Sequence, residues 1–296
     1  MSFFLRRYEE LGEKFSPDNI SLKKSLRVNT LKISTEKLIS RLKKNKIKLE
    51  KIPFLDDGFF YEADFSLGAT PEYLLGYYYL QEVASQLSVQ VLHPESHELV
   101  LDMSAAPGGK TTQIAGFMKN KGLVVALDNN TLRLNSLRNN LERLGVKNVV
   151  IFKKDSRFVS DLGLKFDKIL LDAPCSGNFV DNNNWLCSRT IEDINSRAML
   201  QKELLKSAVK VLKPGGVLVY STCSLEPEEN ELNISWLLKN HPNLRLVETG
   251  LSVGDEGVVN VFGEQLSSEI KNCRRFWPHK IATQGFFIAK IELRNT

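Results

Sequence analysis

From residue 98 onward, short apolar runs alternate with longer amphipathic stretches. Short apolar runs predict buried strands, and apolar positions that repeat every three or four residues predict helices. The expected strands are 98–103, 123–128, 148–155, 165–172, 215–223, 243–248 and 284–293. The expected helices are 110–120, 131–145, 189–213 and 228–241. Strands and helices that alternate in this way predict a mostly parallel sheet covered on both faces, which is an α/β fold.

The chain before residue 98 has a different pattern. Segments 25–32, 34–45 and 47–55 predict a strand, a helix and a strand, which together form a small α+β unit. The next stretch, 69–92, has helical spacing and is expected to bridge to the larger unit. We therefore expect a small N-terminal domain over residues 1–78 and an α/β domain over residues 79–296.

Charge separates the two parts of the chain. The overall net charge is +5, yet residues 1–54 contain 14 Lys and Arg against 6 Asp and Glu, a net of +8. The remaining residues contain 26 against 29, a net of −3. A basic N-terminal unit beside a nearly neutral body suits a polyanionic partner such as RNA, although a solvated helix surface would give the same excess.

Several classes of protein are disfavoured. No apolar run approaches the length of a membrane span, and the N-terminal segment lacks the pattern of a secretory signal, so we expect a cytoplasmic protein with no membrane partner. The cysteines form no CxxC pair and the histidines show no ligand spacing, which argues against a metal site such as zinc. Since the chain shows no secretory signal, disulfides are not expected either. The cysteines and histidines are Cys175, Cys187, Cys223, Cys273, His93, His97, His241 and His279.

Polar or reactive residues follow the central strands. In an open α/β sheet, ligands bind at the carboxyl ends of the strands. The loop DMSAAPGGKTT, residues 102–112, would let a ligand approach the backbone closely. It fails as a phosphate-binding P-loop because Ser104 stands where the first glycine is required. Asp128, about twenty residues further on, suits the two hydroxyls of a ribose, as in NAD or S-adenosylmethionine.

Six segments resemble the Sun-type RNA cytosine-5 methyltransferases, especially the archaeal tRNA enzymes. They are SLRVNTLK, YYYLQEVASQL, LDMSAAPGGKTTQIA, LDAPCSG, YSTCSLEPEENE and FWPH…TQGFF, which together span residues 25–287. The resemblance implies a Rossmann-like class I methyltransferase fold with a seven-stranded, mostly parallel sheet. The resemblance also implies that the cofactor is S-adenosylmethionine and that the partner is RNA. We favour tRNA as this RNA, with ribosomal RNA as the alternative.

The family's chemistry gives the two cysteines separate roles. Carbon 5 of cytosine becomes nucleophilic only after a thiolate adds to carbon 6, which is covalent catalysis. The resemblance assigns this attack to Cys223 and product release to Cys175. Asp172 would bind near the N3 and amino edge of the cytosine, and Lys110 would line the same pocket. The target nucleotide should be flipped into that pocket.

The resemblance also implies a cofactor site and an RNA contact. The residues expected to hold S-adenosylmethionine are Ser104, Ala105, Ala106, Pro107, Gly108, Gly109, Lys110, Asp128, Arg133, Asp155 and Asp172. Arg27, Asn29 and the lysines of the first 54 residues are expected to meet phosphates, which would make binding salt-sensitive. A monomer is the default expectation.

Glutamates surround Cys223 in sequence, although thiolates favour electropositive surroundings. We expect Glu226, Glu228 and Glu229 to lie at a helix start and to turn away from the thiol, while Lys110 and the cofactor's positive charge stabilise the thiolate. Two other functions stay open. A thiol oxidoreductase would also use two cysteines, and an RNA-binding protein without catalysis would keep the basic unit.

Other positions are expected to be structural or depart from the family pattern. Cys187 and Cys273 lie outside the matching motifs, and we expect them to be structural, as we do His93, His97 and His241. His279 matches a family motif, but Ile281 replaces a second histidine often found there. The stretch NFVDNNNW, residues 178–185, replaces a glycine- and arginine-rich run of many relatives.

Overall fold

The computed structural model describes residues 2–180, 182, 184–281 and 283–295. Within them, one large sheet has nine strands. These are β5 (Leu99–Asp102), β6 (Leu123–Asp128), β7 (Val149–Lys153), β8 (Phe166–Asp172), β9 (Leu212–Thr222), β10 (Leu244–Val247), β11 (Asp255–Glu256), β14 (Arg274–Phe276) and β15 (Phe286–Leu293). The strand order is β11-β14-β15-β9-β8-β5-β6-β7, and β10 also pairs with β15.

All seven strands predicted for the α/β unit are present in this sheet. Strands β5 to β9 pair in parallel, whereas β15 runs antiparallel to β9. The edge beyond β15 is shared, because β10 pairs with its second half and β14 with its first half. The sequence analysis missed β14 and β11. A separate ribbon pairs β12 (Asn260–Val261) with β13 (Glu264–Gln265).

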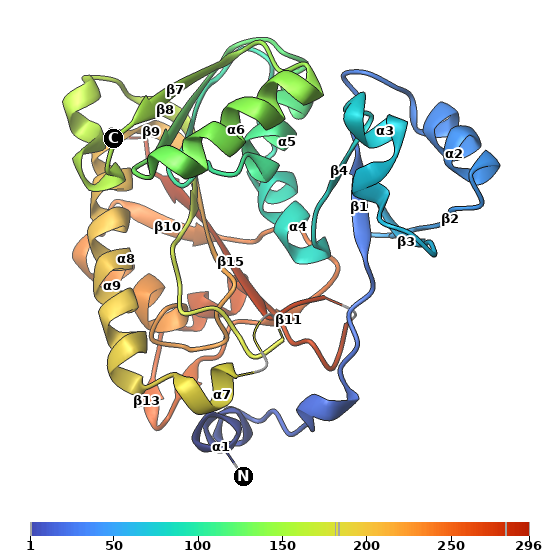
Figure 1. Ribbon diagram of the computed structural model, residues 1–296. Coiled ribbons are helices and arrows are strands. Elements are labelled where there is room, and N and C mark those ends of the chain that lie inside the picture. The colour runs from blue at the N-terminus through green and yellow to red at the C-terminus, as the bar shows by residue number, and fades with distance from the viewer. Residues whose placement is uncertain (1, 181, 183, 282, 296) are drawn as a thin grey trace.

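Helices cover both faces of the large sheet (Figure 1). They are α4 (Val83–Leu92), α5 (Gly109–Phe117), α6 (Thr131–Leu144), α8 (Ile191–Val211) and α9 (Glu231–Asn240). In β8, Ile169 and Leu171 pack into the core under α8 and α9, while Leu170 packs on the opposite face with α4 and α5. Because side chains alternate along a strand, a strand buried on both faces is an unbroken apolar run, which is the pattern that predicted it.

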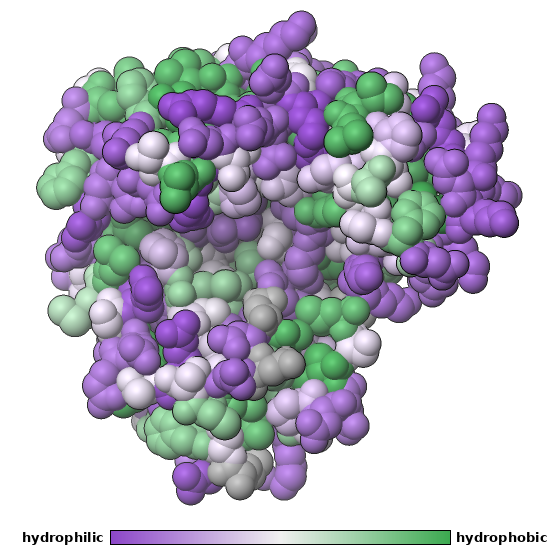
Figure 2. All heavy atoms as spheres, viewed as in Figure 1, coloured by the Kyte–Doolittle hydropathy of each residue, from purple (hydrophilic) through white to green (hydrophobic). Residues whose placement is uncertain are grey.

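The N-terminal unit is a small antiparallel sheet with one long helix. Its strands, in the order β2-β3-β1-β4, are β2 (Lys48–Lys51), β3 (Gly58–Glu62), β1 (Ser25–Val28) and β4 (Tyr78–Leu80). Helix α2 (Thr35–Lys44) buries Leu38 and Leu42 against them. Figure 2 shows hydrophilic residues along the edge of the molecule where Figure 1 places α2.

The predicted helical stretch 69–92 is wrong in its middle. It contains α3 (Pro71–Leu74), then β4, and only then α4. Gly76 interrupts the helix at φ +73°, where the Cβ of any other residue would collide with the carbonyl oxygen of Arg143. The tyrosines that follow pair as a strand with β1. The long-range pairing therefore overrides the local helical spacing.

The first helix, α1 (Phe3–Glu10), lies away from the small sheet and beside α7 (Trp185–Ser188) (Figure 1). Phe4 and Tyr8 are buried in a cluster with Trp185, Leu225 and Trp277 of the larger unit. The domain boundary at residue 78 stays a prediction. The remaining elements are 3-10 turns: η1 (Pro17–Asn19), η2 (Leu67–Ala69), η3 (Ser156–Leu162) and η4 (Ser268–Asn272).

Candidate active site

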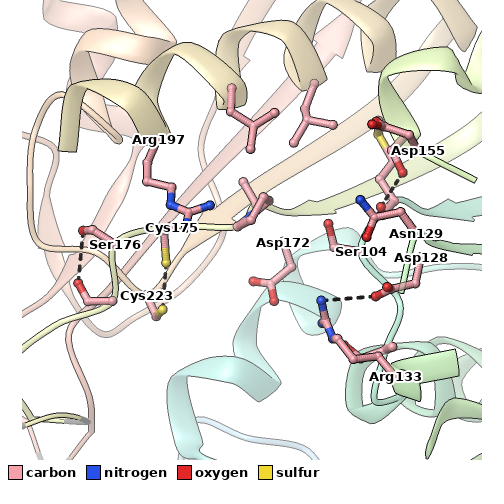
Figure 3. A pocket seen from close by; sticks show the side chains of 18 of the residues that line it. Ser104, Asp128, Asn129, Arg133, Asp155, Asp172, Cys175, Ser176, Arg197 and Cys223 are labelled. Carbon is pink, nitrogen blue, oxygen red and sulfur yellow. Dashed lines mark hydrogen bonds and ion pairs between the residues drawn. The ribbon is translucent and has the colours of Figure 1, made fainter. Parts of the chain in front are cut away.

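A cavity of about 670 Å³ lies at the carboxyl ends of the parallel strands. Figure 3 shows side chains from several of these strand ends turned toward it. The sequence-predicted residues that line it are Ser104, Ala106, Asp128, Arg133, Asp155, Asp172, Cys175 and Cys223. The fold therefore brings together residues that are up to 119 positions apart, from Ser104 to Cys223.

The two thiols meet in this cavity. Cys223 directly follows β9 and Cys175 lies in the loop after β8. Since Asp172 at the end of β8 pairs with Ser221 of β9, the parallel pairing places the two loops side by side. The sulfur atoms are 2.8 Å apart, longer than the roughly 2.05 Å of a disulfide bond, so no disulfide joins them in this structure. Both side chains are partly exposed to the cavity.

Asp172 is held from two sides. The ammonium of Lys110 donates to its Oδ2 at 2.7 Å and the hydroxyl of Ser221 donates to its Oδ1 at 2.8 Å. Burial lowers the pKa of Lys110, but the carboxylates of Asp172 and Asp102 outweigh burial and leave this pKa raised. Lys110 is therefore a fixed cation, and it also interacts electrostatically with Cys223. Lys110 itself does not line the cavity, and it contacts the cavity through Asp172.

The glycine-rich turn between β5 and α5 has a buried carboxyl group behind it. Thr111 Oγ1 donates to Asp102 Oδ2 at 2.7 Å, and the backbone N–H of Ser104 donates to its Oδ1 at 3.3 Å. Burial raises the pKa of Asp102 to about 6. Gly108 has φ +109°, and a Cβ there would come within 2.9 Å of Leu137 Cδ1, so the turn requires glycine.

Only part of the predicted turn reaches the cavity. Ser104 and Ala106 line it, whereas the other four predicted loop positions lie outside its lining: Ala105, Pro107, Gly108 and Gly109. Ala105 packs with Leu134 and Leu137 of α6 beneath the turn. These positions therefore shape the turn and do not face the cavity.

Two further carboxylates lie across the cavity from the thiols (Figure 3). Asp128 accepts from the backbone N–H of Asn130 at 2.9 Å and pairs with Arg133 at 3.3 Å. Asp155 pairs with Arg157 at 2.7 Å, and this hydrogen bond holds the pKa of Asp155 below its usual value. Both carboxyl groups have oxygens that can accept hydrogen bonds from hydroxyl groups.

The glutamates after Cys223 do not start a helix, because α9 begins only at Glu231. Glu226 accepts from Tyr8 at 2.7 Å and pairs with Arg7 at 3.1 Å, while Glu228 pairs with the same guanidinium at 2.6 Å. The expected placement at a helix start is thus wrong. Partners on α1, not a helix dipole, neutralise these two carboxylates.

The other two glutamates of this stretch are also paired. Glu231 is fully buried and forms a two-pronged ion pair with Arg275, at 2.7 Å for each nitrogen. Glu229 is buried between the two thiol loops and accepts hydrogen bonds from Ser176, Ser224 and Gln201. None of these four carboxylates lines the cavity.

The expected phosphate contacts of Arg27 and Asn29 are wrong. Both side chains are only 5% exposed. Arg27 bonds Thr112, Gln113 and Gly109 O of α5, and burial lowers its pKa to about 10. Asn29 donates to two carbonyl groups, those of Gly76 and Leu144. The two residues therefore join the small sheet to the larger unit and do not face solvent.

The remaining cysteines and His279 lie outside the cavity lining. Cys273 is buried in the core, and burial raises its pKa well above the usual value. Cys187 is exposed on α7. His279 stacks on Phe15 at 4.3 Å and lies 3.0 Å from a Glu13 oxygen. Of the unusual stretch 178–185, Asp181 and Asn183 lie outside the described residues, while Asn178 and Trp185 line the cavity.

Sequence reasoning missed several lining residues. Asn129 and Ser156 directly follow predicted strand-end carboxylates, so their positions were a usable signal. Arg189 directly follows α7 and Arg197 lies on α8, both far from any strand end, and no motif identified them. In the described part of the chain, no group of three or more His, Cys, Asp or Glu could hold a metal ion. No helix there is both long and apolar enough to cross a bilayer.

The chain matches known families over most of its length. Residues 89–292 match the family described as 16S rRNA methyltransferase RsmB/F, and residues 4–83 match the N-terminal domain of 16S rRNA methyltransferase RsmF. The 25S rRNA (cytosine-C(5))-methyltransferase nop2 of Schizosaccharomyces pombe is 38% identical over 299 residues, covering 98% of this chain and 49% of that protein. The tRNA (cytosine(49)-C(5))-methyltransferase of Pyrococcus abyssi is 40% identical over 275 residues, covering 91% and 88%.

Several of these relatives are much longer. The chain spans about half of the Schizosaccharomyces pombe protein (49%) and 36% of the Homo sapiens 28S rRNA (cytosine(4447)-C(5))-methyltransferase, to which it is 41% identical over 291 residues. Two solved structures match it over nearly their full lengths. A methyltransferase homolog from Pyrococcus horikoshii has a TM-score of 0.85 at 44% identity, with 97% of this chain and 90% of that chain covered.

A second solved structure is NSun6 from Pyrococcus horikoshii with SFG. Its TM-score is 0.83 at 31% identity, with 94% of this chain and 92% of that chain covered. These likenesses confirm the predicted Rossmann-like methyltransferase fold and the resemblance to the Sun-type enzymes. With the match over residues 89–292, they place this chain in the 16S rRNA methyltransferase RsmB/F family.

Proposed function

We propose that this protein methylates carbon 5 of cytosine in RNA, using S-adenosylmethionine and a covalent bond to Cys223. The contact between the two thiols, 2.8 Å apart beside the Lys110–Asp172 pair, is the observation that supports this most strongly. A single nucleophilic thiol would serve many enzymes. Two thiols at neighbouring strand ends, in a cavity that is also lined by Asp128 and Asp155, suit a reaction in which one thiol adds to a base and is later eliminated from it.

The cavity has the donors and acceptors that S-adenosylmethionine requires. Asp128 and Asp155 offer carboxyl oxygens as acceptors for ribose and adenosine groups, and the turn at Ser104 offers a backbone that a ligand can approach closely. The glycine at position 108 keeps that turn tight. When bound there, S-adenosylmethionine supplies an electrophilic methyl group, which cytosine carbon 5 takes up once it has become nucleophilic.

The chain's own residues perform the other steps. The Cys223 thiolate adds to cytosine carbon 6, and the electron pair of the 5,6 double bond moves to carbon 5. Lys110 stabilises the thiolate as a nearby cation and orients Asp172, whose carboxylate would accept from the amino group on the N3 and amino edge of the base. After methylation, a base removes the carbon-5 proton, the double bond reforms, and Cys223 leaves as thiolate. We assign Cys175 to this release step because of its contact with Cys223.

We infer that tRNA is the substrate, with ribosomal RNA as the alternative. The relative from Pyrococcus abyssi, matched over 88% of its length, is named as a tRNA enzyme, whereas the longer relatives are named as ribosomal RNA enzymes. The exposed basic side chains of α2, which include Lys37, Lys43 and Lys44, suit phosphate contacts and replace the buried Arg27 and Asn29 in that role.

Transfer of labelled methyl from S-adenosylmethionine to unmodified tRNA or ribosomal RNA tests the proposal, followed by identification of the nucleoside. Wild type should yield 5-methylcytosine, and Cys223→Ala should yield none. Cys175→Ala should accumulate a covalent RNA adduct that denaturing electrophoresis detects. Cys187→Ala, which removes an exposed thiol outside the cavity, is the matched control and should behave as wild type. Bound cofactor with no label in either RNA would refute the proposal.

A further inference from the structure

One wall of the catalytic cavity comes from helices and not from strand ends. Arg189 lies at the end of α7, and Arg197 and Leu200 belong to α8. Figure 3 shows the Arg197 guanidinium extending from α8 toward the side where Cys175 and Cys223 meet, away from Asp128 and Asp155. Arg189 is half-buried, whereas Arg197 is exposed.

These two arginines differ from the other cations that line the cavity. Arg133 pairs with Asp128 at 3.3 Å, Lys154 with Asp161 at 2.8 Å, and Arg157 with Asp155 at 2.7 Å. Among the described residues, no carboxylate pairs with the two arginines on the helix wall. The Nε–H of Arg189 is shielded from solvent and donates to no acceptor in the same part of the chain.

Guanidinium groups that line a binding cavity and have no carboxylate partner point to an anionic acceptor brought by the ligand. The planar fork of arginine matches phosphate in a two-pronged geometry. A nucleotide flipped into the cavity must bring its own phosphodiester groups with it, and these stay near the mouth while the base reaches the thiol.

We propose that Arg189 and Arg197 form a subsite for the RNA phosphodiester next to the flipped cytidine. The subsite rests on the proposed RNA methylation. Exposed Arg197 contacts the phosphate at the rim, and half-buried Arg189, which lines the same cavity, adds a second guanidinium. Arg197 extends toward the thiol side, so the subsite holds the sugar-phosphate chain where cytosine carbon 6 can meet Cys223 (Figure 3).

Steady-state methyl transfer tests the subsite with Arg197→Gln and Arg189→Gln. Each should raise the KM for RNA about tenfold, which is the range for one charge-assisted hydrogen bond, and should flatten the salt dependence of RNA binding by about one unit of slope. The dissociation constant for S-adenosylmethionine should not change. Lys206→Gln is the control, because Lys206 lies on the same helix, 5.2 Å above the ring of Trp236 and outside the cavity lining.

A substrate with one neutral methylphosphonate beside the target cytosine identifies the ligand directly. Wild type should lose about the same factor as Arg197→Gln does with normal RNA, and the variant should lose nothing further. Equal losses in both enzymes would overturn the subsite. A weaker affinity for S-adenosylmethionine with an unchanged KM for RNA would instead assign the arginines to the cofactor's carboxylate. A wild-type protein that methylates no RNA would refute the proposed function. An active wild type whose arginine variants keep the same KM for RNA would refute the subsite alone.

Discussion

Glu229 joins the two loops that hold the thiols. Its carboxylate accepts from the N–H and hydroxyl of Ser176 at 3.1 and 2.5 Å, and from the hydroxyl of Ser224 at 2.7 Å. Gln201 of α8 adds a fourth hydrogen bond at 2.7 Å. Ser176 directly follows Cys175 and Ser224 directly follows Cys223. A single buried group thereby fixes the distance between the two sulfurs.

Two substitutions of Glu229 should separate its charge from its shape. Glu229→Ala removes the acceptor of four hydrogen bonds in a buried position, and we expect it to lower the free energy of unfolding by about 3 kcal/mol. Glu229→Gln can keep the geometry, since its amide oxygen accepts from two donors and its amide nitrogen donates to the two hydroxyls. The Glu229→Gln substitution should lower the free energy of unfolding by only about 1 kcal/mol.

The effect on catalysis should follow geometry. A displacement of about 1 Å between reacting groups can cost about a hundredfold in rate, so Glu229→Ala should lower kcat on the order of a hundredfold with little change in the KM for RNA. Glu229→Gln should recover most of kcat. Glu228→Ala is the control, because Glu228 is in the same turn but pairs with Arg7. Single-turnover methyl transfer, measured below the melting temperature of each variant, reports the rate of the chemical step.

A Glu229→Ala protein that is folded by circular dichroism and has wild-type kcat would refute the reasoning. It would mean that the strands alone position the thiols. Loss of kcat in Glu229→Gln as large as in the alanine variant would refute the geometric part, because the charge itself would then be required.

Three further predictions follow from the site. Asp128→Asn should keep the bond from the Asn130 N–H but weaken S-adenosylmethionine binding about 10- to 100-fold by calorimetry, and unchanged affinity would exclude a ribose role. Hydrogen peroxide should oxidise Cys175 and Cys223 to a disulfide with release of water. Methyl transfer should then stop until dithiothreitol is added. If the number of titratable thiols does not fall by two, the prediction is wrong. Burial raises the pKa of Glu226 from 4.5 to about 7, so the folded protein binds a proton that the unfolded chain releases, and stability should fall by about 3 kcal/mol as pH rises from 4.5 to 7. Glu226→Gln should flatten that slope in chemical denaturation, and an unchanged slope would assign it to another group.

The large sheet was predictable because its strands are buried on both faces. Ile169, Leu170 and Leu171 form one apolar run, and no turn signal interrupts it. The small sheet was only half predictable. In 69–92 the apolar spacing suits a helix, and only the pairing of β4 with β1, about 50 residues earlier, makes a strand there. Local patterns do not contain such pairings.

The site was predictable where chemistry follows a strand end, as at Asp128, Asp155 and Cys223. Burial of polar residues was not. Arg27 lies in a basic segment that suggests a solvated surface, yet its partners Thr112 and Gln113 belong to a helix more than 80 residues later. The sequence contains the donor and the acceptors, but the docking of the two units decides whether the donor meets water or protein.

The contacts of the first helix could not be predicted from local sequence patterns either, because its partners lie far along the chain. Arg7 and Tyr8 bond Glu226, three residues after Cys223. Phe4 packs on Trp185 with ring centres 4.6 Å apart, and the indole N–H of Trp185 donates to the carbonyl oxygen of Ser176 at 2.8 Å. Helix α1 thus supports both thiol loops, one through charge and one through an aromatic contact. A methyltransferase body cut at residue 79 would lack these partners, so the residues at the start of the chain belong physically to the catalytic site even though none of them lines the cavity.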